Sequence, residues 1–242
     1  MKNGEKRSVK NFAIVPAFNE EETIVEVITR LKSLGIKPIV VDDHSTDRTA
    51  TLARTNGATV IKHMGNRGKG HAMRAGLDYL LNKHPEAEHI VFIDADMQYT
   101  PEDAQKMVEL LEDGKSDFIT GYRNWNLVPF RHSLGNFVWR STFNILFGTR
   151  LKDTNCGLMA LKKNAIEKIK DSITGGYIIE NSIIIEALKN DLRIEQIPVP
   201  VFYKKVSRIK RGIKTVAGVL LFIIKEGLKY RLSNFSKANF KK

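Results

Sequence analysis

Two aspartates with one residue between them, Asp94 and Asp96, are the side chains in this sequence best suited to chemistry. They directly follow residues 90–93, four consecutive apolar residues that predict a short buried strand. In an open α/β sheet, the carboxyl ends of the strands face the ligand crevice. Two carboxylates at that place suit a divalent cation that holds a phosphorylated substrate. A polar turn without a ligand is the alternative, because aspartate is common in turns.

The elements that must position these aspartates are predicted from hydrophobic periodicity. Strands are expected at residues 11–16, 39–41, 59–61, 90–93 and 118–120. Amphipathic helices are expected between them, with Asn19 as the N-cap of the first and Thr100 followed by Pro101 at the start of a later one. This alternation predicts an α/β fold, a mostly parallel sheet with helices on both faces.

The second half of the sequence is less regular. Helices are expected at residues 134–147, 178–188 and 209–232, and strands before residue 163 and at residues 193–203. Pro198 and Pro200 confine the last strand to a sheet edge, because proline has no backbone N–H to donate. The helix at residues 209–232 is cationic and carries a short apolar stripe, which is typical of a helix lying on a membrane surface. A helix that packs on the core with a solvated basic side is the alternative.

The net charge of +12 is concentrated at the C-terminal end. Residues 203–242 hold 12 Lys or Arg and one acidic residue, whereas residues 1–202 hold 27 basic and 26 acidic residues. This asymmetry argues against a nucleic-acid-binding module, although the pI of about 9.7 suggests one. We expect a flexible tail at residues 1–10, one domain at residues 11–206, and a basic, membrane-associating segment at residues 207–242.

The composition is that of an ordinary globular protein, with 42% hydrophobic and 27% charged residues. A single cysteine, Cys156, excludes an internal disulfide. The N-terminus lacks the apolar segment of a secretory signal, and the longest apolar run, residues 219–224, is too short to span a bilayer. We therefore expect a cytoplasmic protein that associates peripherally with the cytoplasmic face of a membrane.

Three motifs fall at successive predicted strand ends, each before a helix: IVPAFNEEETI from Ile14, VVDDHSTDRT from Val40, and VFIDADMQYTPED from Val91. In this order they resemble the family 2 glycosyltransferases of the GT-A fold, and within them the dolichyl-phosphate mannose or glucose synthase group. The resemblance runs over about residues 12–205. It implies a Rossmann-like GT-A sheet and a metal-dependent, inverting transfer of a hexose from a GDP- or UDP-sugar to a polyprenyl or dolichyl phosphate.

The resemblance also implies the donor site. The residues implied to bind the nucleotide sugar are Pro16, Ala17, Phe18, Glu20, Asp43, Asp47, Lys69, Asp94, Ala95 and Asp96. Metal contact with Mg²⁺ or Mn²⁺ is implied for Asp96, with Asp94 and Gln98 beside it. A helix-start role for Asp47 and a solvated loop position for Lys69 are the alternatives.

The family's reacting groups map onto Asp153, Arg123 and Asp96 as catalytic residues. Contact with donor or acceptor phosphate is implied for Arg123, Lys205, Arg208 and Lys210. The family's basic segment does not align cleanly with residues 203–212, so the choice among its three cations stays open. Glu180 falls where the family has an acid on the following helix, which fits either a supporting role or an exposed helical residue.

The acceptor has two interpretations. A lipid-linked phosphate is already ionised at neutral pH and needs little base catalysis, whereas a soluble or glycan hydroxyl would need a base, for which Asp153 is the first candidate. A nucleotidyltransferase is disfavoured, because residues 16–21 read PAFNEE and not a glycine-rich basic loop. The expected partners are a nucleotide sugar, a lipid phosphate and a membrane surface; the basic segment also suits a membrane-protein partner or a homo-oligomer.

Overall fold

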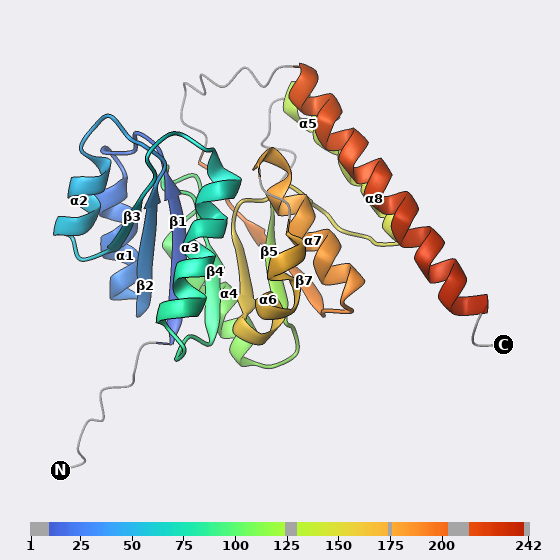
Figure 1. The fold of residues 1–242 in the computed structure, drawn as a ribbon, viewed down its shortest axis with the longest axis horizontal. Helices are drawn as coiled ribbons and strands as arrows, with labels where there is room; N and C mark the ends of the chain where they lie inside the picture. Colours follow the sequence, from blue (N-terminus) through green and yellow to red (C-terminus); the bar gives the residue numbers. More distant parts are fainter. Residues whose placement is uncertain (1–9, 124–129, 174–175, 203–212, 240–242) are drawn as a thin grey trace, which may run out of the picture.

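The computed structural model describes residues 10–123, 130–173, 176–202 and 213–239, and within these ranges seven strands form one sheet (Figure 1). The strands are β1 (Asn11–Ala17), β2 (Ile36–Asp42), β3 (Thr59–Lys62), β4 (His89–Phe92), β5 (Phe118–Arg123), β6 (Met159–Lys162) and β7 (Ile194–Val199). The α-helices are α1 (Ile24–Ser33), α2 (Thr49–Thr55), α3 (Lys69–Lys83), α4 (Pro101–Glu112), α5 (Phe130–Phe147), α6 (Lys163–Ile169), α7 (Ile179–Lys189) and α8 (Ile213–Asn239). Two 3-10 helices, η2 (Lys170–Ser172) and η3 (Gly176–Ile178), precede α7.

The sheet has the order β3-β2-β1-β4-β6-β5-β7, and its pairs are parallel except the two that involve β6. The predicted mostly parallel sheet and the edge position of β7 are confirmed. The reversed direction of β6 was not predicted. Because β6 is antiparallel, Met159 at its start pairs with Phe92 at the end of β4. The residues just before β6 therefore lie beside the residues just after β4, where Asp94 and Asp96 are found.

Alternating side chains divide the core into two layers. Phe12 and Ile14 of β1 belong to the cluster that contains residues of α3, α6 and α7, whereas Ala13 and Val15 belong to the cluster with α1 and α4. This period of two is the pattern of a strand buried on both faces. Each fully buried aliphatic or aromatic side chain contributes about 1.5–3 kcal/mol, so the two layers hold the strand ends in fixed positions.

Helix α8 packs along α5 beside α7, away from the β3 edge of the sheet (Figure 1). The approach is close at Gly227, where an added Cβ would lie 2.6 Å from Leu146 Cβ. Glu226 binds Lys189 of α7 at 2.9 Å, and Arg231 donates from Nε to the Leu146 carbonyl at 2.9 Å. The predicted C-terminal helix is therefore docked on the domain through one side.

The outer side of α8 is apolar and basic together. Leu221, Leu228 and Leu232 are exposed, at 66%, 52% and 69%. Lys225 and Lys229 are exposed on the same stretch, and the spacing of these five residues places them on one helical face. Helix α5 also exposes Phe137, Val138 and Ile145. No helix in the described ranges is both long and apolar enough to cross a membrane.

Candidate active site

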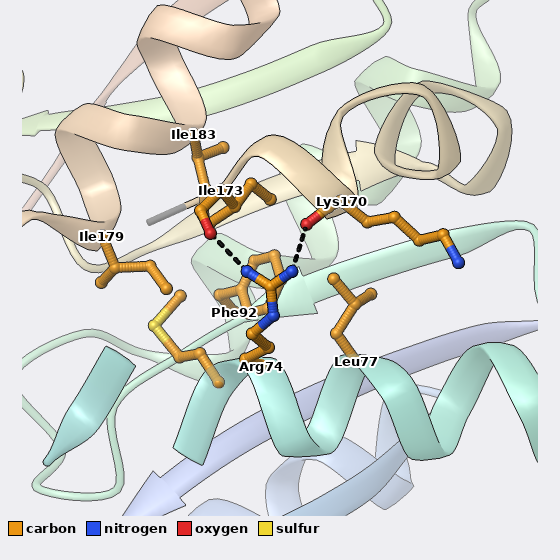
Figure 2. Close-up of a pocket in the computed structure, with 8 residues that line it drawn as sticks. Arg74, Leu77, Phe92, Lys170, Ile173, Ile179 and Ile183 are labelled. Atoms are coloured by element: carbon orange, nitrogen blue, oxygen red, sulfur yellow. Dashed lines mark hydrogen bonds between the residues drawn. The ribbon is translucent and has the colours of Figure 1, made fainter. Parts of the chain in front are cut away.

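One pocket of the molecule is a packing feature and not a ligand site. It lies between α3 and the α6–α7 region, has a volume of about 10 Å³, and is crossed by the side chain of Arg74 (Figure 2). Arg74 donates to the carbonyl of Lys170 at 3.0 Å and to that of Ile173, so it ties α3 to the end of η2. A space of this size holds about one water molecule.

A much larger cleft, of about 480 Å³, opens beyond the carboxyl ends of β1, β2 and β4. Most of the predicted donor residues line it: Pro16, Ala17, Phe18, Glu20, Asp43, Lys69, Asp94, Ala95, Asp96 and Gln98. Asn66, Arg67, Gly68 and Ala72 at the start of α3 and Gly176 and Glu180 near α7 complete its lining. The cleft therefore has the size and position of a small-molecule site.

The turn after β1 is fixed by the loop after β2. Three consecutive backbone N–H groups donate to side chains of that loop: Asn19 to Ser45 Oγ at 2.9 Å, Glu20 to Thr49 Oγ1 at 2.8 Å, and Glu21 to Asp47 Oδ2 at 3.2 Å. Burial opposes ionisation of Asp47, but hydrogen bonds from Thr49 and from backbone N–H groups outweigh it and lower its pKa. Asp47 does not line the cleft; its carboxylate holds the turn that does.

Asn19 is not the N-cap of α1, so that prediction is wrong. The helix begins at Ile24 with Thr23 as its N-cap and no side-chain cap hydrogen bond. Asn19 has φ 55°, and its Oδ1 accepts from the N–H of Thr46 at 2.8 Å. Left-handed residues also follow the neighbouring strands, at His44 after β2 and Met97 after β4. Such conformations often gather at functional sites, and these three bend the chain around the cleft.

Asp43 fastens the glycine-rich loop that precedes α3. It accepts from the N–H of Arg67 at 2.8 Å, from the N–H of Gly68 at 2.6 Å, and lies 2.8 Å from His63 Nδ1. Burial opposes its ionisation, but these hydrogen bonds outweigh burial and lower the pKa of Asp43. The carboxylate thus links β2 to the loop that forms one wall of the cleft.

Lys69 joins two acids from different elements. Its Nζ lies 2.7 Å from Oδ1 of Asp94, after β4, and 2.9 Å from Oε1 of Glu180, in the first turn of α7. Burial opposes the charge on Lys69, but the two carboxylates outweigh burial and raise the pKa of the ammonium. Lys69 is therefore bound in an ion-pair cluster and is not a solvated loop lysine.

Gly157 is the residue that lets this cluster form beside β6. A Cβ at Gly157 would lie 2.5 Å from Asp94 Oδ2 and 2.9 Å from Lys69 Nζ. Both distances are too short for a side chain at this position, so any Cβ here would push the Asp94 carboxylate and the Lys69 ammonium out of place. The antiparallel β6 thereby brings Gly157 against Asp94.

Asp96 is held by its own turn. Its Oδ1 accepts from the N–H of Gln98 at 3.0 Å, and Met97 between them has φ 60°. The Gln98 carbonyl accepts from the N–H of Phe202 at 3.1 Å. The predicted phosphate-binding residues Lys205, Arg208 and Lys210 lie outside the described residues, which stop beside this turn at Phe202.

Arg123 and Asp153, which are not among the residues that line the cleft, form a forked ion pair with each other. Nε of Arg123 donates to Oδ2 of Asp153 at 2.7 Å, and Nη2 donates to Oδ1 at 3.0 Å. The backbone N–H groups of Arg123 and Asn155 donate to the same carboxylate at 3.3 and 3.0 Å. Burial opposes the charge on Arg123, but Asp153 outweighs burial and raises the pKa of the guanidinium. Four donors therefore occupy a carboxylate that has about four acceptor positions.

Two side chains of the 153–157 region and its surroundings are held neutral. Burial raises the pKa of the Cys156 thiol to about 12 and raises the pKa of Tyr99 well above its ordinary value. Tyr99 accepts at its hydroxyl from the Gly157 N–H at 3.4 Å. A buried, neutral thiol is a poor nucleophile, so Cys156 packs as a small buried side chain.

Asn181, next to Glu180, is a buried polar residue that the sequence did not reveal. It is fully buried, and its Nδ2 donates to Oδ1 of Asn155 at 2.6 Å. Glu180 precedes it and binds Lys69, so the first turn of α7 supports both the ion-pair cluster and the turn before β6. Neither contact follows from local spacing, because the partners are far apart in the sequence.

The cleft offers oxygen ligands for a hard cation. Asp94, Asp96 and Gln98 all line it, and carboxylate and amide oxygens suit Mg²⁺ or Mn²⁺. Among the residues that the structure describes, no group of three or more His, Cys, Asp or Glu side chains is gathered to hold a metal. The donor set therefore fits a cation that takes its remaining ligands from a phosphorylated substrate.

Comparison with known proteins decides the family. A model of the family described as glycosyl transferase family 2 matches residues 12–170, more than half of the chain. The chain belongs to glycosyl transferase family 2. The predicted family is confirmed, and an uncharacterized protein of Methanocaldococcus jannaschii is 33% identical to this glycosyltransferase over 214 residues, which cover 86% of this chain and 87% of the relative.

Two further similarities concern this glycosyltransferase. A Methanococcus voltae protein named UDP-N-acetylglucosamine–dolichyl-phosphate N-acetylglucosaminyltransferase is 27% identical over 237 residues, 87% of this chain and 92% of the relative. The crystal structure of glucosyl-3-phosphoglycerate synthase from Mycobacterium tuberculosis with Mn²⁺, UDP-glucose and phosphoglyceric acid has a TM-score of 0.70 at 21% identity and covers 90% of this chain and 80% of that one. The structural similarity confirms the predicted GT-A fold.

Proposed function

We propose that this glycosyltransferase moves a hexose from a GDP- or UDP-sugar to a polyprenyl or dolichyl phosphate, with inversion at the anomeric carbon. The observation that carries the proposal is the cleft at the ends of β1, β2 and β4, which Asp94 and Asp96 line and in which Asp94 binds Lys69. The Methanococcus voltae relative, whose name contains dolichyl phosphate, supports the acceptor class.

The donor is proposed to lie along the turn at residues 16–20 and the loop fastened by Asp43. Hydrogen bonds from the β2–α2 loop fix the backbone of the first, and Asp43 fixes the second. A preorganised wall loses little entropy when a nucleotide binds. The exposed Phe18 and the carboxylate of Glu20 line the same wall and are proposed to contact base or ribose.

A divalent cation, Mg²⁺ or Mn²⁺, is proposed at Asp96, with Asp94 and Gln98 as further ligands; when bound, it balances the charge of the departing diphosphate. Arg67 and Lys69, which line the same cleft, add cationic charge to it. Arg123 is proposed to contact phosphate together with Lys205, Arg208 or Lys210, because a guanidinium binds phosphate oxygens well.

The state of Asp153 favours a phosphate acceptor. Its carboxylate already holds four hydrogen-bond donors, which leaves it poorly placed to remove the proton of a hydroxyl acceptor. A phosphate oxygen is ionised at neutral pH and attacks the anomeric carbon without such a base. Asp153 is therefore proposed to act by holding Arg123 in its orientation.

The α5–α8 pair is proposed to lie on the cytoplasmic face of a membrane and to present the cleft to lipid. Leu221, Leu228 and Leu232 alternate on α8 with exposed lysines, which suits a headgroup region containing anionic lipid. The predicted start of the basic segment at residue 207 lies outside the described residues. Its membrane role stays a proposal, which vesicle binding with and without residues 207–242 tests.

The donor half of the proposal is tested by thermal unfolding with GDP- and UDP-sugars, with and without Mn²⁺. We expect one nucleotide class to raise the Tm in the presence of the metal, because a ligand that binds only the folded state stabilises it. Asp96→Asn should abolish the metal-dependent part of the shift, and Asp191→Asn, on the far end of α7, should retain it. A wild-type protein that responds to no nucleotide sugar would refute the donor assignment.

A further inference from the structure

The ion-pair cluster at Lys69 occupies the place where the proposed cation needs a ligand. Asp94 is the carboxylate that Lys69 and a metal would share, and its Oδ1 is 2.7 Å from Lys69 Nζ. Glu180 of α7 holds the same ammonium at 2.9 Å. The side chains of Asp94 and Glu180 are 23% and 13% exposed. Because water solvates these carboxylates poorly, losing the ammonium would cost free energy unless another cation replaced it.

The cluster also has little room to rearrange by itself. Gly157 lies against both Asp94 and Lys69, at distances that leave no space for even a methyl group. Lys69 begins α3, and Glu180 lies in the first turn of α7, so two helix ends set the separation of the charges. Asp94 lines the cleft, so an incoming metal ion would compete with the ammonium for this carboxylate, whose Oδ2 faces Gly157.

We propose that Lys69 acts as a stand-in cation that keeps Asp94 from the metal until a nucleotide diphosphate enters the cleft. The inference rests on the proposed function. The diphosphate offers the ammonium new oxygen acceptors, which releases Asp94 for the metal, while Glu180 keeps Lys69 at the cleft wall. Lys69 and Glu180 are therefore positioning residues, and they couple metal binding to donor binding.

This arrangement predicts a measurable coupling. Because binding free energies are linked reciprocally, the nucleotide raises the affinity for Mn²⁺ by the same factor as Mn²⁺ raises the affinity for the nucleotide. Removing the ammonium should remove the part of this coupling that comes from competition for Asp94. The metal should then bind Lys69→Gln without a nucleotide about tenfold more tightly than it binds the wild type.

The test is a titration of the full chain with Mn²⁺, free Mn²⁺ being measured by electron paramagnetic resonance, without nucleotide and with saturating UDP or GDP. Loss of a positive charge alone would also attract Mn²⁺, so the decisive variant is Lys69→Gln with Glu180→Gln. That pair leaves the net charge of the cluster unchanged and still frees Asp94. Lys106→Gln, which removes an exposed lysine paired with Asp103 on α4, is the matched control for the loss of a positive charge.

We expect the charge-matched double variant to bind Mn²⁺ more tightly than the wild type without nucleotide, and to show a smaller gain on adding nucleotide. If the double variant binds Mn²⁺ as weakly as the wild type, or if Lys106→Gln tightens binding equally, the inference is overturned. Those outcomes differ from failure of the proposed function, in which the wild type would bind no Mn²⁺ even with UDP or GDP present. Circular dichroism of each variant confirms that the comparison is between folded proteins.

Discussion

Arg123 at the end of β5 donates two parallel hydrogen bonds, of 2.7 and 3.0 Å, to the carboxylate of Asp153, which lies six residues before β6. The pair joins two strands that run in opposite directions, and Asp153 is 1% exposed. Removing one partner of a buried pair leaves the other charge uncompensated. The pair is thus both a structural clamp at the sheet end and the anchor of the cation proposed to contact phosphate.

Arg123→Ala should lower the free energy of unfolding by about 3–5 kcal/mol, because it leaves Asp153 buried without its counter-charge. Urea unfolding at neutral pH measures the change. Arg193→Ala breaks a similar fork with Asp117 at the surface and should cost much less. Equal losses in the two variants would show that the Arg123–Asp153 pair has no special structural weight.

Gly157→Ala should reduce sugar transfer strongly while leaving the protein folded. The new Cβ would lie 2.5 Å from Asp94 Oδ2, so the Asp94–Lys69 pair must move. A displacement of about 1 Å at a reacting site costs on the order of 100-fold in rate. Gly65→Ala is the matched control, because a Cβ at Gly65 meets open space. If both variants transfer sugar at the wild-type rate, the close approach at Gly157 has no functional role.

The hydrogen bonds that Asp43 accepts from Arg67 and Gly68 should make the folded protein less stable at low pH. Hydrogen bonds to Asp43 lower its folded-state pKa below the ordinary 3.8, so its contribution is fully present above that value and is lost as the pH falls through the lowered pKa. The difference in unfolding free energy between wild type and Asp43→Asn should therefore be larger at about pH 7 than at about pH 3. A difference that stays constant over this range would exclude a stabilising role of the ionised Asp43 carboxylate.

Vesicle binding should depend on the outer face of α8. Changing Leu221, Leu228 and Leu232 to serine should weaken binding to vesicles of mixed anionic and neutral lipid, because it removes exposed apolar area. Lys225→Gln with Lys229→Gln should reduce the dependence of binding on anionic lipid and on salt. Lys115→Gln with Lys168→Gln, which alters exposed lysines elsewhere, is the charge control. Unchanged binding by both α8 variants would argue that this face meets no membrane.

Local sequence patterns predicted the first five strands, the helices between them and the aspartates after β4, because these follow from hydrophobic periodicity; helix α6 was not predicted. Thr100 does cap α4, with its Oγ1 accepting from the Asp103 N–H at 3.3 Å, since capping is a contact between near neighbours in the chain. The same local rule predicted Asn19 as an N-cap, and this prediction was wrong. Residues Ser45 and Thr46 of the loop after β2 form the hydrogen bonds of Asn19 instead. Tertiary hydrogen bonds overrode the local preference.

Only the site residues that belong to the ordered motifs could be predicted from the sequence. The cleft lining agrees with most of the donor residues implied by resemblance, whereas the Lys69–Glu180 contact and the buried Asn181 depend on how α7 packs near β4. The reversed direction of β6 decides that Gly157 meets Asp94, and nothing in the periodicity of a four-residue strand sets its direction. These contacts depend on long-range packing, which local spacing does not encode, so they were not predicted from the sequence.

Product analysis distinguishes hexose transfer to a lipid-linked phosphate from transfer to a hydroxyl. The full chain is incubated with UDP- or GDP-hexose, Mn²⁺ and vesicles that contain either dolichyl phosphate or dolichol, and the lipids are analysed by mass spectrometry. We predict a dolichyl-phosphate hexose only with the phosphorylated lipid, and its loss in Asp96→Asn. Transfer to dolichol or to a soluble hydroxyl acceptor, with none to dolichyl phosphate, would contradict the claim.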